Sequence, residues 1–406
     1  MGLAGDGQAR LPDGGDCFVH LALPGETVLA NVDRSRVSLE AVLTASPDRV
    51  APPCPHFAAC GGCSLQHWAD APYAAWKAAK LGEALSRAGY TDVPVAPMQR
   101  SPLHERRRAD LAFRRTATGL ALGFHARGSA EVVALESCAL LDPRLVALFA
   151  PLRELLRRLT AVQRQGSAVL NLLDSGPDLL LRTDGVLDQH GRAALAGFAR
   201  DHGLPRIAWA RGTAEPEMAA QLGSVHITLS GVRVAPAPGA FLQASPQGEA
   251  AIIAAVLAAL PKKLGPKARI AELYAGIGTL SFPLSQRARV SAYEGSPEAV
   301  LALQAASGSH RIQAEKRDLD RRPLLPLDLK PFQVVVLDPP FAGAVEQVGQ
   351  LAKAKVPHII YVSCNPAALG RDAAVLRKAG YRCVAATPID QFPFSAHLDA
   401  VVAFAM

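Results

Sequence analysis

The 406-residue chain lacks the sequence features of secreted and membrane-spanning proteins. Its first residues contain no basic segment followed by an apolar one, and no stretch of about 18 apolar residues runs without a charge or a proline. Internal repeats and low-complexity tracts are also missing. We therefore expect a cytoplasmic protein with no membrane association. Because 50% of the residues are hydrophobic, the chain can bury large cores, and its length suggests two or three domains.

Acidic residues are fewer than basic ones, which leaves a formal net charge of +7. The basic residues form local clusters, for example at 106–108 and 153–158. A moderate positive excess suits a polyanionic partner such as RNA. Solvated surface faces explain any single cluster equally well, so charge alone does not establish nucleic-acid binding.

Cysteine is scarce, and its distribution is uneven. Of the seven cysteines, Cys54, Cys60 and Cys63 share one segment rich in glycine and proline, and Cys138 comes much later. In a cytosolic chain such a cluster indicates a metal site before it indicates disulfides. Three thiolates plus a distant fourth match the ligand count of an iron–sulfur cluster, and four thiolates also suit tetrahedral zinc. The spacing does not choose between them.

The first half of the chain predicts two units. In residues 1–50, glycine-rich turns separate short strands at 17–21, 27–32 and 37–43, a pattern typical of a small β-barrel that binds nucleic acid. The alternative is a β extension that only packs. Residues 51–235 contain the cysteine segment, an amphipathic helix at 71–88, several strands and a leucine-rich helix at 143–159. They predict a central α+β domain.

From residue 236 strands and helices alternate, which predicts an α/β fold with a parallel sheet. A glycine turn with Gly276, Gly278 and Thr279 follows the strand at 269–274, and the strand at 289–293 ends at Glu294. Glycines let the backbone approach a ligand, and a carboxylate at the next strand end can accept hydrogen bonds from ribose hydroxyls. The sequence therefore predicts a nucleoside-cofactor site, although Glu294 taken alone is also compatible with a surface carboxylate.

Later strands bring further polar groups to the same edge. Asp318 follows one strand, and Asp338 ends another in an Asp-Pro-Pro turn that the prolines stiffen. The strand at 358–362 delivers Cys364 to a Ser-Cys-Asn-Pro turn, where a nucleophile would lie, although a lone thiol in this setting is more often inert. Asp399 opens the last apolar strand, a position that a simple turn acid would also occupy.

Together with the segments 22–26 and 239–243, these motifs resemble the S-adenosylmethionine-dependent RNA 5-methyluridine methyltransferases. The match runs nearly end to end and is to the branch with an iron–sulfur cluster that modifies 23S ribosomal RNA. The resemblance implies a TRAM-like barrel at 1–50, a central domain with the cluster at 51–235, and a Rossmann-like class I methyltransferase domain at 236–406. It implies a monomer whose partner is RNA, either 23S rRNA or an assembling large-subunit precursor.

The resemblance also assigns the site residues. It implies a four-iron four-sulfur cluster on Cys54, Cys60, Cys63 and Cys138. The S-adenosylmethionine contacts that it implies are Gln243, Tyr274, Gly276, Gly278, Thr279, Glu294, Asp318 and Asp338. Cys364 would add to carbon 6 of uracil, Asp338 would orient the base, and Asp399 would act as the general base at carbon 5. The target uridine is expected to be flipped out or held in a splayed loop.

Two positions depart from the family pattern. Asp399, in His397-Leu398-Asp399, replaces a glutamate, and Phe341 stands where arginine commonly follows Asp-Pro-Pro. A second hypothesis is therefore an RNA-binding protein of the same fold that has lost turnover. A methyltransferase acting on tRNA uridine is a further alternative, and one acting on cytosine or a small molecule is disfavoured by the barrel and by the residues around Cys364.

Overall fold

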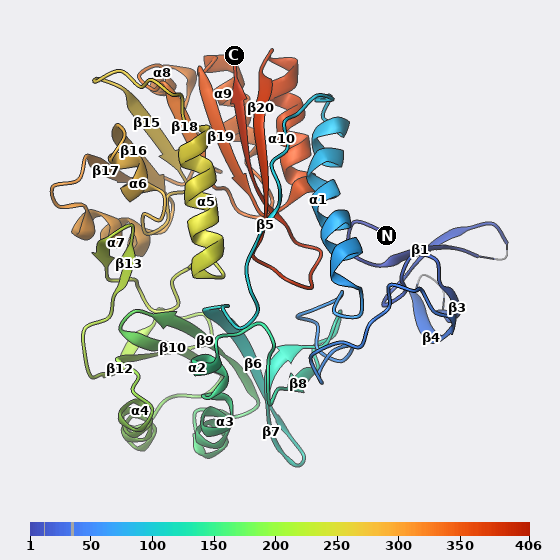
Figure 1. Cartoon of the computed structure of the whole chain (residues 1–406). Coiled ribbons are helices and arrows are strands. Elements are labelled where there is room, and N and C mark those ends of the chain that lie inside the picture. Colours follow the sequence, from blue (N-terminus) through green and yellow to red (C-terminus); the bar gives the residue numbers. More distant parts are fainter. Residues whose placement is uncertain (12, 34–35) are drawn as a thin grey trace.

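An eight-stranded sheet organises the C-terminal half of the chain in the computed structural model, which describes residues 1–11, 13–33 and 36–406 (Figure 1). The strand order is β17 (Ile312–Lys316), β16 (Arg289–Glu294), β15 (Arg269–Leu273), β18 (Val334–Leu337), β19 (His358–Ser363), β21 (Asp399–Ala405), β20 (Arg382–Asp390) and β5 (Gln99–Arg100). The first five strands are parallel, and β21 runs antiparallel to both of its neighbours. The α/β prediction is confirmed, and the antiparallel strand is an addition to it.

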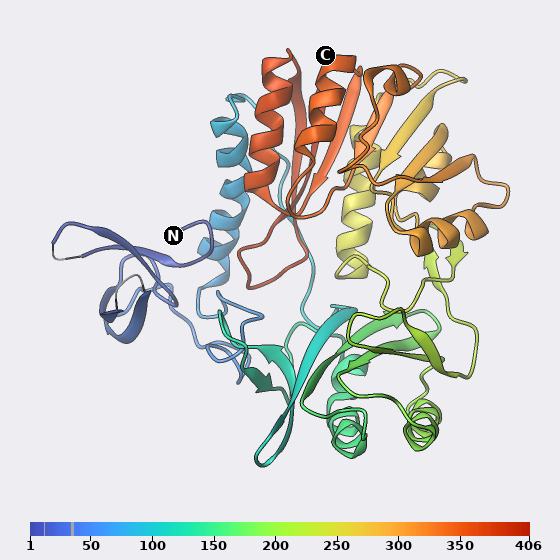
Figure 2. The same ribbon diagram turned by 180° about the vertical axis from the view of Figure 1, so that it is seen from behind.

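Helices cover both faces of this sheet, as Figures 1 and 2 show from opposite sides. One face packs against α5 (Pro246–Ala259), α6 (Ser281–Ser285) and α7 (Pro297–Ser307), and the other against α1 (Asp70–Arg87), α8 (Pro326–Leu329), α9 (Val345–Ala354) and α10 (Pro366–Lys378). Strands buried on both sides are apolar throughout, and all four residues of β18 are buried. The strand order reverses between β15 and β18, which is where open α/β sheets bind ligands.

Helix α1 and strand β5 lie in this C-terminal unit, which differs from the expected division at residues 51–235. Leu81 and Leu85 of α1 share a core with β18, β19 and α10, and β5 pairs with the edge strand β20. An amphipathic helix must cover its apolar face, and the partner that α1 finds is far away in the sequence.

A seven-stranded sheet forms the central unit. Its order is β12 (Glu217–Gln221), β11 (Arg206–Arg211), β10 (Gly176–Thr183), β9 (Gln165–Leu173), β6 (Arg108–Thr116), β7 (Gly119–His125) and β8 (Val132–Ala134). Its core is shared with α2 (Pro143–Val146), α3 (Phe149–Arg158) and α4 (Gln189–Asp201). The single helix expected at 143–159 is two helices, because Pro151 lacks an amide hydrogen and its ring would clash with the carbonyl of Ala147. The hairpin β13 (Ile227–Leu229) and β14 (Val232–Val234) leads to the C-terminal unit.

The N-terminal residues are rich in strand, as expected. Strands β1 (Gly7–Arg10) and β2 (Asp16–Val19) form one antiparallel ribbon, and β3 (Thr27–Asp33) and β4 (Arg36–Thr44) form another. Over the described part of this region the two ribbons are separate sheets and do not close into one barrel. Leu29 and Leu43, which a closed barrel could enclose, are at least half exposed.

Among the described residues, no helix combines the length and the apolar character that crossing a bilayer requires.

Candidate active site

A cavity of about 970 Å³ opens at the carboxyl ends of the parallel strands, beside the reversal in strand order. Its lining includes all the site residues predicted outside the cysteine cluster except Gly278, namely Gln243, Tyr274, Gly276, Thr279, Glu294, Asp318, Asp338, Cys364 and Asp399. Residues from seven segments of the sequence thus converge on one space. The residues predicted to bind a cofactor and the predicted nucleophile lie at the same edge of the sheet.

Gly278 serves the packing of the glycine turn. Its φ is +102°, and an added Cβ would lie 2.6 Å from Leu303 Cδ1 and 2.8 Å from Phe282 Cε2. Only glycine fits there without a shift of the neighbouring helices. Gly276 also has a positive φ, of +55°, but an added Cβ there would meet nothing within 4 Å. Gly276 faces the cavity, and Gly278 lets the turn approach α6 and α7.

Glu294 is held in place by backbone donors at the end of β16. Its carboxylate accepts hydrogen bonds from Gly276 N and Ser296 N, both at 2.8 Å. These bonds cross between two neighbouring strand ends and orient the carboxylate toward the cavity. Its position and partners are not those of a simple surface carboxylate.

Tyr274 has left-handed backbone geometry directly after β15. Its φ is +62°, which costs a residue with a side chain on the order of 1–2 kcal/mol. The hydroxyl donates to Asp320 Oδ1 at 3.2 Å, and burial together with the charge of Asp320 raises the tyrosine pKa. Strain of this kind is concentrated at binding and catalytic sites.

Glu272 is a buried acid to which the sequence reasoning gave no role. It is 2% exposed, lines the cavity and accepts a hydrogen bond from Ser281 Oγ at 2.5 Å. Burial raises the pKa of Glu272 to about 8. The sequence signal that could have identified Glu272 is the presence of a carboxylate within a strand whose neighbouring residues are apolar.

Four side chains form a chain of hydrogen bonds across the floor of the cavity. Gln391 donates through Nε2 to Gln243 Oε1 at 2.7 Å and to Asp399 Oδ2. Gln243 in turn donates to Asp338 Oδ2 at 3.4 Å, and Gln391 Oε1 accepts from Ala244 N at 2.9 Å. Gln391 thus joins the two carboxyl groups predicted for catalysis, and it was not among the predicted residues.

Burial changes the acidity of the three groups at this end of the cavity. It raises the pKa of Asp338 to about 7 and that of Asp399 to about 8, and for Asp399 the charge of Asp338 adds to the rise. The hydrogen bond from Gln391 and the charge of Lys77 act in the opposite direction on Asp399. Burial, with the charges of Asp399 and Asp338, raises the pKa of Cys364 to about 11. Carboxyl groups poised near neutral pH beside a thiol are typical of acid–base and nucleophilic catalysis.

Phe341 lies at the mouth of the cavity and is 56% exposed. Its ring meets the ring of His397 edge-on, with 5.6 Å between centroids. Its carbonyl accepts a hydrogen bond from Asn365 Nδ2 at 3.0 Å. At the position where the resemblance leads us to expect arginine, Phe341 therefore offers an aromatic ring, and no cation, next to the turn that carries Cys364.

The four predicted metal ligands lie in one neighbourhood. The backbone of Cys60 forms an isolated antiparallel β-bridge with Ala126, in the turn after β7, and Gly61 N donates to His125 O at 2.9 Å. Burial is the main cause that raises the pKa of Cys63, to about 12, and the charges of the other three cysteines contribute. Within the described ranges, no group of three or more histidine, cysteine or acidic side chains is arranged to hold a metal ion. The structure thus brings the thiols together but does not confirm a metal site.

The strand order and the cavity at its reversal define a Rossmann-like α/β domain with a cavity at the carboxyl ends of its strands, where such folds bind ligands. A structure of similar fold is the tRNA (uracil-54, C5)-methyltransferase of Pyrococcus abyssi in complex with S-adenosyl-L-homocysteine, with a TM-score of 0.73 and 21% identity. The alignment covers 98% of this chain and 100% of that one.

Sequence comparisons identify the family. The family model described as tRNA (Uracil-5-)-methyltransferase matches residues 239–405. An uncharacterized RNA methyltransferase of Brucella suis is 40% identical, over 99% of this chain and 95% of the relative. The 23S rRNA (uracil(1939)-C(5))-methyltransferase RlmD of Halomonas elongata is 37% identical over 99% and 88%, and that of Chromohalobacter salexigens is 34% identical over 98% and 86%. The chain belongs to the RNA (uracil-5-)-methyltransferase family, whose methyl donor is S-adenosylmethionine.

Proposed function

We propose that this protein methylates carbon 5 of a specific uridine in 23S rRNA through a covalent bond between Cys364 and uracil carbon 6. The observation that carries the proposal is the shared cavity, in which Cys364, Asp338 and Asp399 face the residues expected to bind the cofactor. The two relatives named for uracil 1939 of 23S rRNA support ribosomal RNA as the substrate. The protein is expected to act in the cytoplasm and as a monomer.

The first chemical step belongs to Cys364. Carbon 5 of uracil is a weak nucleophile, so the thiolate adds to carbon 6 and the ring electrons move to give an enolate. Because the pKa of Cys364 is raised, its proton must pass to a neighbouring base as the sulfur attacks. Asp338 hydrogen-bonds the base and stabilises the charge that develops on the ring. S-adenosylmethionine, when bound, supplies the electrophilic methyl group that carbon 5 attacks.

Asp399 completes the reaction. It removes the proton from carbon 5, the double bond between carbons 5 and 6 re-forms, and the bond from carbon 6 to sulfur breaks with its electron pair returning to Cys364. A raised pKa near 8 matches a base that must take a proton and give it up again near neutral pH. The hydrogen bond from Gln391 fixes the shorter aspartate side chain toward the cavity.

The cofactor is proposed to lie along the glycine turn. Glu294, already aligned by two backbone amides, has lone pairs free for the ribose hydroxyls. Gln243, Tyr274, Thr279 and Asp318 surround the same part of the cavity. Asp338 lies between this part and Cys364 and is proposed to serve both cofactor and uracil.

We also propose that Cys54, Cys60, Cys63 and Cys138 hold a four-iron four-sulfur cluster. Burial and mutual repulsion disfavour free thiolates there, and binding iron removes both penalties. The partly buried guanidinium of Arg106 interacts electrostatically with Cys138 and Cys63 and would offset the negative charge of a loaded site. Its role is structural or RNA-positioning, and the TRAM-like ribbons at 1–50 are proposed to contact RNA.

The test is to map 5-methyluridine by mass spectrometry in ribosomal RNA from cells with and without the gene. One 23S rRNA position should lose its methyl group in the deletion, regain it with the wild-type gene and stay unmethylated with Cys364→Ala. An unchanged ribosomal RNA together with a lost methyl group in tRNA would assign the substrate to tRNA instead.

A further inference from the structure

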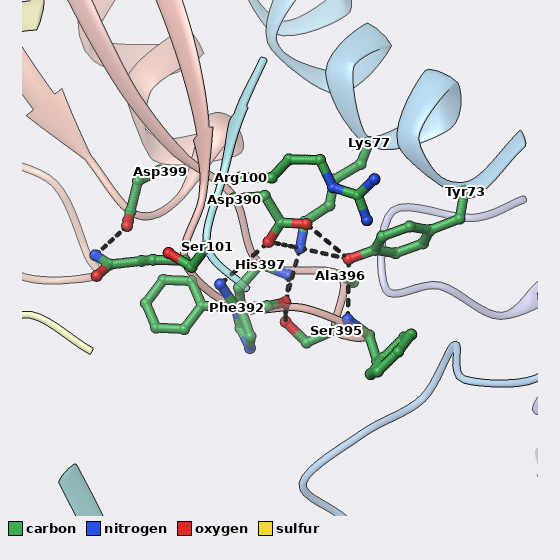
Figure 3. A network of polar contacts seen from close by, with 12 residues as sticks. Tyr73, Lys77, Arg100, Ser101, Asp390, Phe392, Ser395, Ala396, His397 and Asp399 are labelled. Atoms are coloured by element: carbon green, nitrogen blue, oxygen red, sulfur yellow. Dashed lines mark hydrogen bonds and ion pairs between the residues drawn. The ribbon is translucent and has the colours of Figure 1, made fainter. Parts of the chain in front are cut away.

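The loop of residues 391–398 contributes Gln391 and Phe392 to the lining of the cavity, and Figure 3 shows residues of helix α1 that contact the loop. It joins β20 to β21, between Asp390 at the end of one strand and Asp399 at the start of the next. Ile389 is directly opposite Asp399 in the pairing of these strands. Any shift of this loop therefore moves the proposed base.

Lys77 of helix α1 reaches this loop from the side away from the cavity. Its ammonium lies 2.6 Å from Asp390 Oδ1 and donates to the carbonyl oxygen of Phe392 at 2.8 Å. The side chains of Lys77 and Asp390 are both 0% exposed. A lysine on an amphipathic helix is usually solvated, so complete burial against one distant acid is a specific arrangement.

Tyr73, one turn earlier on α1, closes the network. Its hydroxyl accepts from Lys77 Nζ at 2.9 Å and from Phe394 N at 3.0 Å, and it donates to Asp390 Oδ2 at 2.9 Å. Figure 3 shows these groups meeting around the Asp390 carboxylate. All the hydrogen-bonding capacity of the tyrosine hydroxyl is used, and two of its three partners belong to the segment that leads to Asp399.

Two further sets of contacts hold the same loop, one from residues 64–65 and one from α1. The carbonyl of Phe394 accepts from Ser64 N at 2.9 Å and from Leu65 N at 3.0 Å, directly after Cys63. Lys80, on the next turn of α1, donates to the carbonyl of Ala396. The loop is thus fixed by groups that never reach the cavity.

Inside the cavity the same loop presents Gln391 and Phe392. Gln391 follows Asp390 directly in the sequence and donates a hydrogen bond to Asp399. Gln391 therefore connects the buried Lys77–Asp390 pair to the proposed base. A buried ion pair contributes little net stability, because desolvation offsets the attraction between its charges. The Lys77–Asp390 pair therefore suggests a role other than stability.

We propose that Tyr73, Lys77 and Asp390 are positioning residues for the general base, holding the 391–398 loop so that Gln391 aims the Asp399 carboxylate at carbon 5 of uracil. This inference rests on the proposed function. It assigns to helix α1 a part in the second half of the reaction, proton removal and release of the thiol, and none in the first half, addition of Cys364.

The test uses two variants that keep the core filled. Tyr73→Phe removes only the hydroxyl, and Lys77→Met combined with Asp390→Asn removes both charges together, which avoids leaving one charge buried alone. With unmodified RNA and cofactor, each variant should release methylated RNA about 10 to 100 times more slowly than wild type, and a methylated covalent complex should accumulate. With 5-fluorouridine RNA, which stops the reaction before release, the rate of adduct formation should stay within about twofold of wild type.

Arg87→Gln is the matched control, since Arg87 lies on the same helix but pairs with Glu83 at the surface. It should leave both rates unchanged. Release as fast as wild type in the two variants would overturn the inference, as would a loss of adduct formation in parallel with release, which would indicate a merely structural role. Failure of the wild-type protein to form any adduct would overturn the proposed function itself, and the inference with it.

Discussion

At the scale of single residues, the replacement of the family glutamate by Asp399 is the most informative departure. The carboxyl group is 3% exposed, and Gln391 donates to it. We infer that the site accommodates the shorter aspartate side chain, and that the backbone position and the hydrogen bond from Gln391 compensate for the missing methylene. The continuous chain of hydrogen bonds from Asp399 to Asp338 argues against the alternative of an RNA-binding protein that has lost catalytic turnover.

This view predicts that Asp399→Glu impairs the protein. The change adds a methylene at a buried position, so we expect the free energy of unfolding to fall by about 1–3 kcal/mol and turnover to fall about tenfold. Calorimetry and single-turnover methylation measure the two effects. Faster turnover in Asp399→Glu would show instead that the natural aspartate is a defect.

The residues proposed to bind or react could be predicted from the sequence, whereas the residues that support them could not. Cys364 and Asp338 follow apolar strands within distinctive turns, a local signal. Gln391 and Lys77 carry no such signal, because their roles depend on Asp399 and Asp390, which only the folded chain brings to them. Buried polar networks are three-dimensional properties, and residue type alone does not disclose them.

At the scale of elements, the glycine turn after β15 separates two uses of glycine. Gly278→Ala places a methyl group against Leu303 and Phe282, whereas Gly276→Ala meets no neighbour. Without cofactor, we expect Gly278→Ala to lower the free energy of unfolding by about 2–4 kcal/mol and Gly276→Ala by only about 1 kcal/mol. Chemical denaturation measures both, and equal losses would contradict the packing role of Gly278.

The cysteine segment offers a second prediction at this scale. Protein purified without oxygen should contain about four irons per chain, and Cys63→Ser should lose most of them. Cys17→Ser and Cys383→Ser are the controls and should retain the iron. Because Ser64 and Leu65 bind Phe394 O, removing the iron should also expose the 391–398 loop to faster hydrogen exchange. Zinc in place of iron, in protein kept anaerobic throughout, would contradict the cluster assignment.

The elements of the C-terminal unit were predictable because its strands are buried on both faces and read as apolar runs between helices. The break in the helix at 143–159 followed from Pro151 and was readable in principle. The docking of α1 on α10 was not, since an amphipathic pattern shows that a face is buried but not what covers it.

At the scale of the whole molecule, three buried carboxyl groups link stability to pH. The pKa values of Glu272 and Asp399 are raised to about 8 and that of Asp338 to about 7. The folded protein then holds protons that the unfolded chain has released above about pH 4.5, so the contribution of these three groups to stability is fully present below that pH and is lost as pH rises toward 8. We expect the melting temperature of the ligand-free protein to fall between pH 5 and pH 8.5, and Glu272→Gln to flatten this fall. A rise over the same range would contradict the account.

The central claim is that Cys364 bonds covalently to uracil carbon 6 in RNA. The most direct measurement incubates the full chain with cofactor and a 23S rRNA fragment carrying 5-fluorouridine at the methylated position, followed by mass spectrometry of the digested complex. Fluorine cannot leave carbon 5 as a proton, so the account predicts a stable complex in which the peptide containing Cys364 carries the methylated 5-fluorouridine, and no complex with Cys364→Ala. A methylated fragment with no covalent complex, or a complex through another residue, would contradict it.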